Sequence, residues 1–192
     1  MFRKESNALI TTEAVTFFES GEPVGIIAAR HVPMLVPAEL YNPGKERDYL
    51  SLQFDASMVG RTFSDDVGPY KAVYSLTQND VDTLSRLPFL QRPVSETTLA
   101  FRMLDELDTA SAIFIGHSAT FFDVAVTGKK EPLLANRFLL TEPADILYYL
   151  LNIIRQFNLR SPELLLHFHG EEDKKLVQLL KTHLIKPVIL ES

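Results

Sequence analysis

The chain has 192 residues, of which 46% are hydrophobic and 23% are charged, and its formal net charge is −6 at neutral pH. This apolar share can bury a core in one domain or two small ones, and the ordinary charge content argues against a disordered chain. The absence of cysteine excludes disulfides, thiolate nucleophiles and cysteine-rich zinc sites. Lysine and arginine are scattered along the sequence, so no nucleic-acid partner is expected.

No stretch of the sequence reaches the ~20 apolar residues that a transmembrane helix requires. The longest apolar stretch, 146–154, is interrupted by Asn152. Residues 1–7 are polar and show no apolar run of the signal-peptide type. We therefore expect a cytoplasmic protein with no membrane partner.

The first half of the chain alternates apolar runs with turn residues, which is typical of short strands and helices. The run 24–29 is apolar throughout, as in a strand buried on both faces, and 49–54 fits either type of element. The expected elements, in chain order, are a helix or equally a strand over 7–20, strands over 24–29 and 34–36, a helical turn over 37–41, strands over 61–67 and 71–76, and helices over 78–87 and 95–107.

The second half shows a clearer succession of elements. We expect strands over 111–115, 120–126 and 133–140, a turn over 127–130, a helix ending near Phe157, a strand over 164–168, a helix over 171–184 and a last strand over 187–190. Thr141 is the predicted N-cap of the helix that ends near Phe157. Apolar residues cover well over half the circumference of that helix, which predicts burial on most of its sides.

The predicted order of the second half defines a fold class. Three antiparallel strands followed by helix–strand–helix–strand (βββαβαβ) predict a mixed sheet covered by helices, the pattern of the ribonuclease-H-like fold. Two such lobes make the actin-like fold, and the first half is compatible with a second, shorter lobe. Residues 89–93 are a plausible link, so we expect a partial N-terminal lobe over 1–92 and a C-terminal lobe over 93–192.

Several motifs resemble a family of uncharacterised Bacteroidetes proteins with an actin-like ATPase fold. The motifs are Leu-Leu-Ala-Asn-Arg-Phe at 133–138, the threonine at 141, Asp-Ile-Leu-Tyr-Tyr-Leu-Leu at 145–151 and, more weakly, Met-Leu-Val-Pro-Ala-Glu-Leu-Tyr at 34–41. The resemblance implies about one more strand-hairpin unit ahead of the first helix, so the N-terminal lobe looks shortened. An open sheet edge there would be completed by another chain, which favours a homodimer or another protein partner.

The resemblance also points to a phosphate-binding hairpin over 112–120. Gly116 stands where active actin-like proteins need a glycine, but Phe114 takes the place of the metal-handling carboxylate and Ser118 replaces a second glycine. Gly170 is the one glycine left in the loop after the fourth strand, and the acidic residues 171–173 that follow would repel phosphate. The candidate positions for ATP and magnesium, on degenerate loops, are therefore Gly116, His117, Ser118 and Gly170.

Two histidines are the candidates for a metal site. His167 and His169 lie two apart on a predicted strand, so both rings would point to the same face. Two ordinary imidazoles at a half-exposed strand end are the favoured interpretation, because no third ligand is evident. No metal cofactor is therefore expected.

Other polar and aromatic residues receive structural interpretations. A solvated turn is favoured over an acid/base pair for Asp65 and Asp66, and Asp145 is expected to support the start of its own helix. Tyr148 and Tyr149 either line the groove between lobes or, as favoured, pack in an aromatic core.

These observations favour a catalytically inactive actin-like protein that acts as an interaction or scaffold module, rather than an enzyme. The alternative is a nucleotide-binding switch or ATPase with a degenerate site. A third hypothesis is a metal-binding protein that uses His167 and His169.

Overall fold

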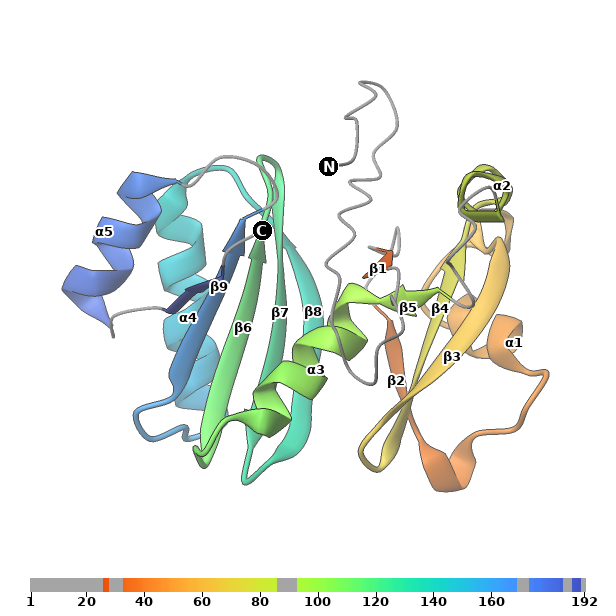
Figure 1. Ribbon diagram of the computed structural model, residues 1–192, viewed down its shortest axis with the longest axis horizontal. Coiled ribbons are helices and arrows are strands. Elements are labelled where there is room, and N and C mark those ends of the chain that lie inside the picture. The colour runs from red at the N-terminus through yellow and green to blue at the C-terminus, as the bar shows by residue number, and fades with distance from the viewer. Residues whose placement is uncertain (1–25, 28–32, 86–92, 169–172, 185–187, 191–192) are drawn as a thin grey trace. The chain divides into compact units, whose positions relative to one another are not determined.

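The computed structural model describes residues 26–27, 33–85, 93–168, 173–184 and 188–190. The chain divides into two compact units, an N-terminal unit of residues 1–99 and a C-terminal unit of residues 100–192. Both units combine strands with helices (Figure 1). Among the described residues, no helix is both long and apolar enough to cross a bilayer.

The C-terminal unit contains a five-stranded mixed sheet. Its elements are β6 (Ser111–His117), β7 (Phe121–Gly128), β8 (Glu131–Leu139), α4 (Pro143–Gln156), β9 (Glu163–Phe168), α5 (Lys174–His183) and β10 (Val188–Leu190). The strands lie in the order β10-β9-β6-β7-β8, with β6, β7 and β8 antiparallel and β6, β9 and β10 parallel. The predicted succession βββαβαβ is confirmed.

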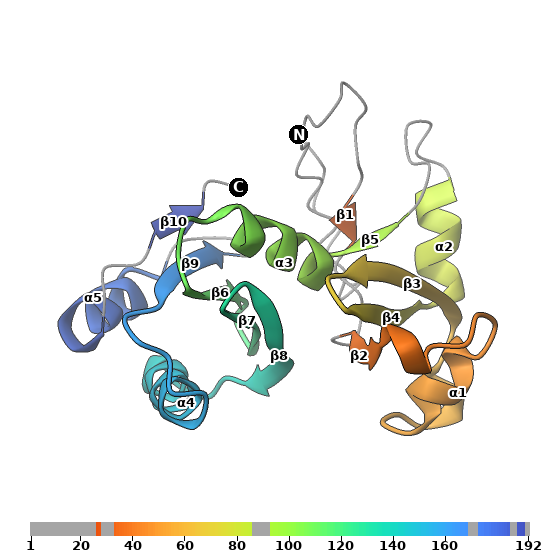
Figure 2. The same cartoon turned by 90° about the horizontal axis from the view of Figure 1, so that it is seen from below.

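One face of this sheet forms the core of the unit with α4 and α5 (Figures 1 and 2). Side chains alternate along each strand, so every second residue reaches this face. The buried cluster includes Ile113, Ile115, Val124, Val126, Leu164 and Leu166 from the strands and Ile146, Leu150, Leu176 and Leu180 from the helices. Burying one such side chain contributes about 2 kcal/mol. The C-terminal part of helix α3 (Glu96–Glu106) lies on the opposite side of the sheet (Figure 2).

Helix α4 differs from its prediction at its surface and at its start. Only one stripe is buried, and Tyr148 and Leu151 are 64% and 47% exposed, so the expected burial on most sides is wrong. The sheet covers one face of the helix, and within the described residues nothing covers the other. The N-cap is Glu142 instead of Thr141, and the Asp145 carboxylate accepts hydrogen bonds from the backbone N–H groups of both residues. The expected supporting role of Asp145 is thereby confirmed.

The turn between β7 and β8 consists of Lys129 and Lys130. Both have positive φ, at 53° and 62°, which is the geometry of a two-residue type I′ hairpin turn. This turn matches the right-handed twist of the flanking strands, which pair from Gly128–Glu131 to Phe121–Leu139 with a register shift between Val126 and Thr127. The turn expected over 127–130 is confirmed.

The N-terminal unit is built around a three-stranded antiparallel sheet in the order β2-β4-β3. Its elements are β1 (Ile26–Ile27), β2 (Met34–Pro37), the 3-10 turn η1 (Ala38–Leu40), α1 (Glu46–Ser51), η2 (Ala56–Met58), β3 (Arg61–Val67), β4 (Tyr70–Leu76), α2 (Gln78–Ser85) and β5 (Val94–Ser95), followed by α3. Strands β1 and β5 pair in parallel as a separate ladder. The ambiguous stretch 49–54 falls at the end of α1, and the helix or strand expected over 7–20 lies outside the described residues.

A buried carboxylate in the N-terminal unit accepts hydrogen bonds from residues at the start of α3. Asp65 is 4% exposed, and its Oδ2 accepts hydrogen bonds from the Ser95 N–H at 3.3 Å and the Thr98 hydroxyl at 3.0 Å. Asp66, its neighbour on β3, is exposed and pairs with Lys71 at 2.5 Å. The predicted solvated turn is therefore wrong. Both acids lie in a strand, whose alternation sends one side chain inward and the other outward.

Candidate functional site

The hairpin between β6 and β7 is the predicted phosphate-binding element. Gly116 and His117 are the last residues of β6, and Ser118 follows them. The Ser118 N–H donates to the Phe121 carbonyl at 3.0 Å, which closes the hairpin on itself. Backbone N–H groups bind phosphate only when they are free to point at it, so this N–H does not serve as a phosphate donor in this arrangement.

Phe114 lies where the resemblance calls for a carboxylate. Its side chain is 4% exposed, and its ring stacks on His167 of β9 with a centroid separation of 6.5 Å. An aromatic ring offers neither a metal ligand nor a hydrogen-bond acceptor for water of the kind that a carboxylate provides. His167 is thereby engaged in packing at the position where a metal ligand was considered.

Four residues form a row across this face of the sheet, on the side opposite the core with α4 and α5. The strand register places Arg137 of β8 opposite Asp123 of β7, Asp123 opposite Gly116 of β6, and Gly116 opposite His167 of β9. Neighbouring strands lie ~4.8 Å apart, so this polar row spans about 14 Å. Gly116, which has no side chain, therefore lies between Asp123 and His167 in this row.

Arg137 and Asp123 form a two-pronged ion pair within that row. The Arg137 Nε and Nη2 donate to the two carboxylate oxygens of Asp123, each at 2.7 Å. The guanidinium carbon also lies 3.9 Å from the centroid of the Phe121 ring. Bidentate geometry and stacking on an aromatic ring are the arrangements that favour arginine over lysine. The carboxylate nearest to Gly116 in this row is therefore already neutralised by the protein itself.

Sequence reasoning missed this ion pair, although two signals were present. Asp123 is a charged residue inside an otherwise apolar strand, and Arg137 belongs to the motif that carries the family resemblance. A charge placed in a buried strand predicts an oppositely charged partner nearby. Which residue supplies the partner depends on the strand register, and a single sequence leaves that open.

The side chain of His117 lies on the opposite face of the sheet from Gly116 and the polar row. His117 faces the core side of the sheet, where its ring contacts Phe168 edge-on at 5.3 Å. Gly170 and His169 lie outside the described residues. Within the described part of the chain, no group of three or more histidine, cysteine, aspartate or glutamate side chains could hold a metal ion.

The acidic segment after β9 is described only at Asp173. This residue is the N-cap of α5, and its Oδ1 accepts hydrogen bonds from the N–H groups of Lys175 and Leu176 at 2.9 and 3.1 Å. The cap occupies the same helix-end donors that an anion would need.

The two tyrosines of α4, for which aromatic core packing is predicted, differ in their surroundings. Tyr149 stacks on Phe138 with a centroid separation of 4.3 Å, whereas Tyr148 is exposed.

A second polar cluster, in the N-terminal unit, joins the segment that follows β2 to strand β3. The Tyr41 hydroxyl donates to Glu46 and contacts the Ser64 hydroxyl at 2.9 Å. Burial raises the pKa of Tyr41, and the hydrogen bond to Glu46 raises it further. Burial alone would raise the pKa of Glu46, but the hydrogen bond from Tyr41 and backbone N–H groups outweigh it and lower the pKa. The pair is thus held as a neutral phenol on a charged carboxylate.

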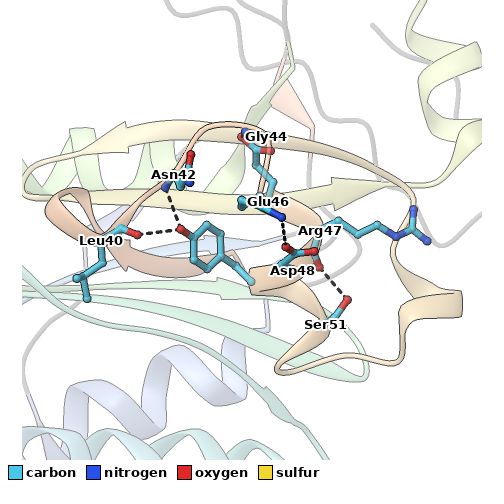
Figure 3. Close-up of polar contacts among 9 residues, drawn as sticks. Leu40, Asn42, Gly44, Glu46, Arg47, Asp48 and Ser51 are labelled. Atoms are coloured by element: carbon cyan, nitrogen blue, oxygen red, sulfur yellow. Dashed lines mark hydrogen bonds and ion pairs between the residues drawn. The ribbon is translucent and has the colours of Figure 1, made fainter.

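Further contacts beside this cluster connect η1 to α1. The hydroxyl of Tyr49 donates to the Leu40 carbonyl at 2.8 Å and accepts from the Asn42 N–H at 2.9 Å (Figure 3). The rings of Tyr41 and Tyr49 stack with a centroid separation of 6.0 Å. These contacts explain why an aromatic residue follows the Leu-Val-Pro strand in the motif at 34–41. They order a loop and assemble no catalytic constellation.

The sheet order, the helices packed on it and the hairpin after β6 define an α/β protein with an actin-like ATPase fold. A crystal structure of a protein from Bacteroides thetaiotaomicron, described as having an actin-like ATPase fold and unknown function, superposes with a TM-score of 0.69. The match covers 88% of this chain and 68% of that chain, at 17% sequence identity. The chain belongs to a family described as protein of unknown function (DUF3822), which it matches over residues 12–186. No curated protein matches the sequence.

Proposed function

We propose that this protein is a catalytically inactive member of the actin-like fold that acts as an interaction or scaffold module. The observation that carries the proposal is Phe114, a buried ring at the position where the resemblance requires a metal-handling carboxylate. Phosphoryl transfer depends on positioned charge and on a metal held by oxygen ligands. A ring packed against His167 supplies neither of these.

Two further features support the proposal. The Asp123 carboxylate on the same sheet face is held by Arg137 in a bidentate pair, so it has no free charge to offer to magnesium. The hairpin donor at Ser118 is bonded to Phe121. Nucleotide binding would therefore require breaking contacts that the folded protein already makes.

Thermal unfolding with and without nucleotide tests the proposal. We expect the melting temperature to be the same with magnesium–ATP, magnesium–ADP and a magnesium sulfate control of equal ionic strength, because a ligand that does not bind the folded state does not stabilise it. The matched variant is Ser118→Asp, which places a negative charge in the hairpin. A saturable rise of more than about 2 °C with ATP in the unaltered protein would favour the nucleotide-switch alternative. Loss of that rise in Ser118→Asp would locate the site at the hairpin.

A turnover assay completes the test. Phosphate release from ATP should match the rate of a buffer blank, and it should be the same for the unaltered protein and for Ser118→Asp. Sustained release that Ser118→Asp abolishes would show an active site on this hairpin and overturn the assignment as inactive.

A further inference from the structure

The outer face of α4 carries an exposed stripe of four residues. Ala144, Tyr148, Leu151 and Arg155 are all exposed, with Tyr148 at 64% and Leu151 at 47%. Their spacings of four, three and four residues place them on one side of the helix. This stripe is on the side of the helix away from Ile146, Leu150 and Ile153, the residues that α4 buries.

The ring of Tyr148 packs against a neighbouring aromatic ring of the same chain. Its ring contacts Tyr149 edge-on at 5.4 Å, and Tyr149 in turn stacks on Phe138 at 4.3 Å. A supported aromatic ring loses little conformational freedom on binding, and tyrosine and arginine are the residue types enriched among the residues that dominate binding energy. The stripe thus combines an anchored tyrosine, a leucine and an arginine.

The two ends of α4 carry opposite charges. Glu142 at the N-cap is exposed, and Asp145 lies in the first turn. Arg155 lies in the last turn, and in the part of the chain that the structure describes it forms no ion pair. Both ends match the helix dipole, so the helix is acidic at its start and basic at its end.

We infer that this stripe is the interface of a homodimer, in which α4 packs antiparallel on α4 of a second copy about a two-fold axis. The spacing of four, three and four reads the same in both directions. An antiparallel arrangement therefore places Tyr148 against Leu151 of the partner subunit and Leu151 against Tyr148 of the partner subunit. A two-fold interface requires such self-complementarity, whereas an unrelated partner does not.

Charge and size complementarity also favour a second copy of this chain as the partner that binds the stripe. The same two-fold places Arg155 over Ala144 of the partner subunit, where the small side chain leaves room for the arginine stem. The guanidinium then lies near Glu142 of the partner subunit, and the pair forms twice. The two helix dipoles run in opposite directions, which favours the antiparallel arrangement. The inference names the partner for the interaction role proposed above and rests on that role.

Sedimentation velocity over a wide concentration range tests the dimer without nucleotide, so it can fail separately from the proposed inactivity. We expect the unaltered protein to dimerise and Leu151→Glu to raise the dimer dissociation constant at least about tenfold. The matched control is Leu52→Glu, which alters an equally apolar side chain that is 81% exposed in the N-terminal unit and should leave the dimer intact. Equal melting temperatures at low concentration confirm that both variants fold. A monomeric unaltered protein, or a dimer insensitive to Leu151→Glu, overturns the inference.

Charge reversal tests the two-fold geometry itself. Arg155→Glu and Glu142→Arg should each weaken the dimer, since each variant faces two like-charge contacts in its own homodimer. An equal mixture of the two variants should dimerise nearly as well as the unaltered protein, because a heterodimer restores an opposite-charge pair at both contacts. A mixture that stays monomeric, or single variants that dimerise like the unaltered protein, contradicts the antiparallel α4 pairing.

Discussion

The guanidinium of Arg137 holds the carboxylate of Asp123 across two neighbouring strands, with both nitrogen–oxygen distances at 2.7 Å. The acid is 8% exposed, so the contact satisfies a charge that would otherwise be nearly cut off from water. The two residues are register partners on β7 and β8, on the sheet face that carries Gly116. One ion pair thereby serves stability and removes a carboxylate from the candidate site.

Replacing Arg137 should therefore cost much more than replacing an exposed arginine. We expect Arg137→Ala to lower the free energy of unfolding by about 2 kcal/mol, because it leaves Asp123 buried without its partner. Arg102→Ala on the exposed face of α3 is the control and should change the free energy by less than about 0.5 kcal/mol. Urea unfolding followed by circular dichroism measures both. Equal effects would contradict the role assigned to the ion pair.

Asp65 and Asp66 provide a comparison of neighbouring carboxylates. Asp65→Ala should destabilise the protein by about 2 kcal/mol, since the Ser95 N–H and Thr98 hydroxyl would lose a buried acceptor. Asp66→Ala removes only an exposed ion pair with Lys71 and should cost less than about 0.5 kcal/mol. Chemical unfolding of the two variants side by side decides the matter. A larger loss for Asp66→Ala would show that the burial of the two acids is assigned the wrong way round.

Gly60 approaches the backbone of β4 too closely for any side chain. A Cβ atom at this position would lie 2.1 Å from the Leu76 carbonyl oxygen, so Gly60→Ala requires the backbone to move. We expect a loss of about 2–3 kcal/mol. Gly44→Ala is the control, because its φ of +86° is strained for alanine but nothing lies within 4 Å, and about 1 kcal/mol is expected. Thermal melts that rank Gly44→Ala as the more harmful change would refute this.

The type I′ turn at Lys129 and Lys130 offers a stabilising change. Lys130→Gly should raise the free energy of unfolding by about 0.5–1 kcal/mol, because glycine adopts the observed φ of 62° without strain. Lys130→Ala removes the same charge but keeps the Cβ atom, so it should be close to neutral. Differential scanning calorimetry compares the two. If alanine stabilises as much as glycine, charge removal rather than backbone strain is the cause.

Acid unfolding should depend on Asp145. Hydrogen bonds from the backbone N–H groups of Glu142 and Thr141 lower the pKa of this carboxyl from its ordinary 3.8. A lowered pKa means that the contribution is fully present above the ordinary value and is lost as the pH falls through the lowered value. Asp145→Asn should therefore reduce the melting temperature at neutral pH and flatten its decline toward about pH 3. Parallel curves for the variant and the unaltered protein would exclude this contribution.

Much of the fold was predictable because its signals are local. The elements from β6 to β10, and the strands β3 and β4, follow from apolar runs of strand length, helical spacing and turn residues, each readable within about ten residues. The stretch 49–54 is ambiguous from the sequence alone, because the six-residue helix α1 that ends within it carries too little periodic signal. The observed N-cap of α4, Glu142, lies one residue after the predicted Thr141, and the N–H groups of both residues donate to Asp145.

The candidate site was predictable only in part. That Phe114 stands where the resemblance calls for a carboxylate is visible from residue types within a motif, so this prediction requires no coordinates. The Arg137–Asp123 pair and the inward position of Asp65 depend on the strand register and on which face the rest of the chain covers. The same holds for Tyr148, which is exposed, whereas its neighbour Tyr149 has the identical side chain but is half-buried against the core.

By itself, the order of residues determined the succession βββαβαβ, the hairpin turn between β7 and β8 and the presence of an aromatic residue at position 114, because these depend on backbone preferences and residue type within one segment. Only the tertiary structure decided which charges are paired and which apolar side chains face water. Those outcomes depend on contacts between segments far apart in the chain. A periodic pattern shows that a helix has an apolar face, but the elements packed around it decide how much of that face is covered.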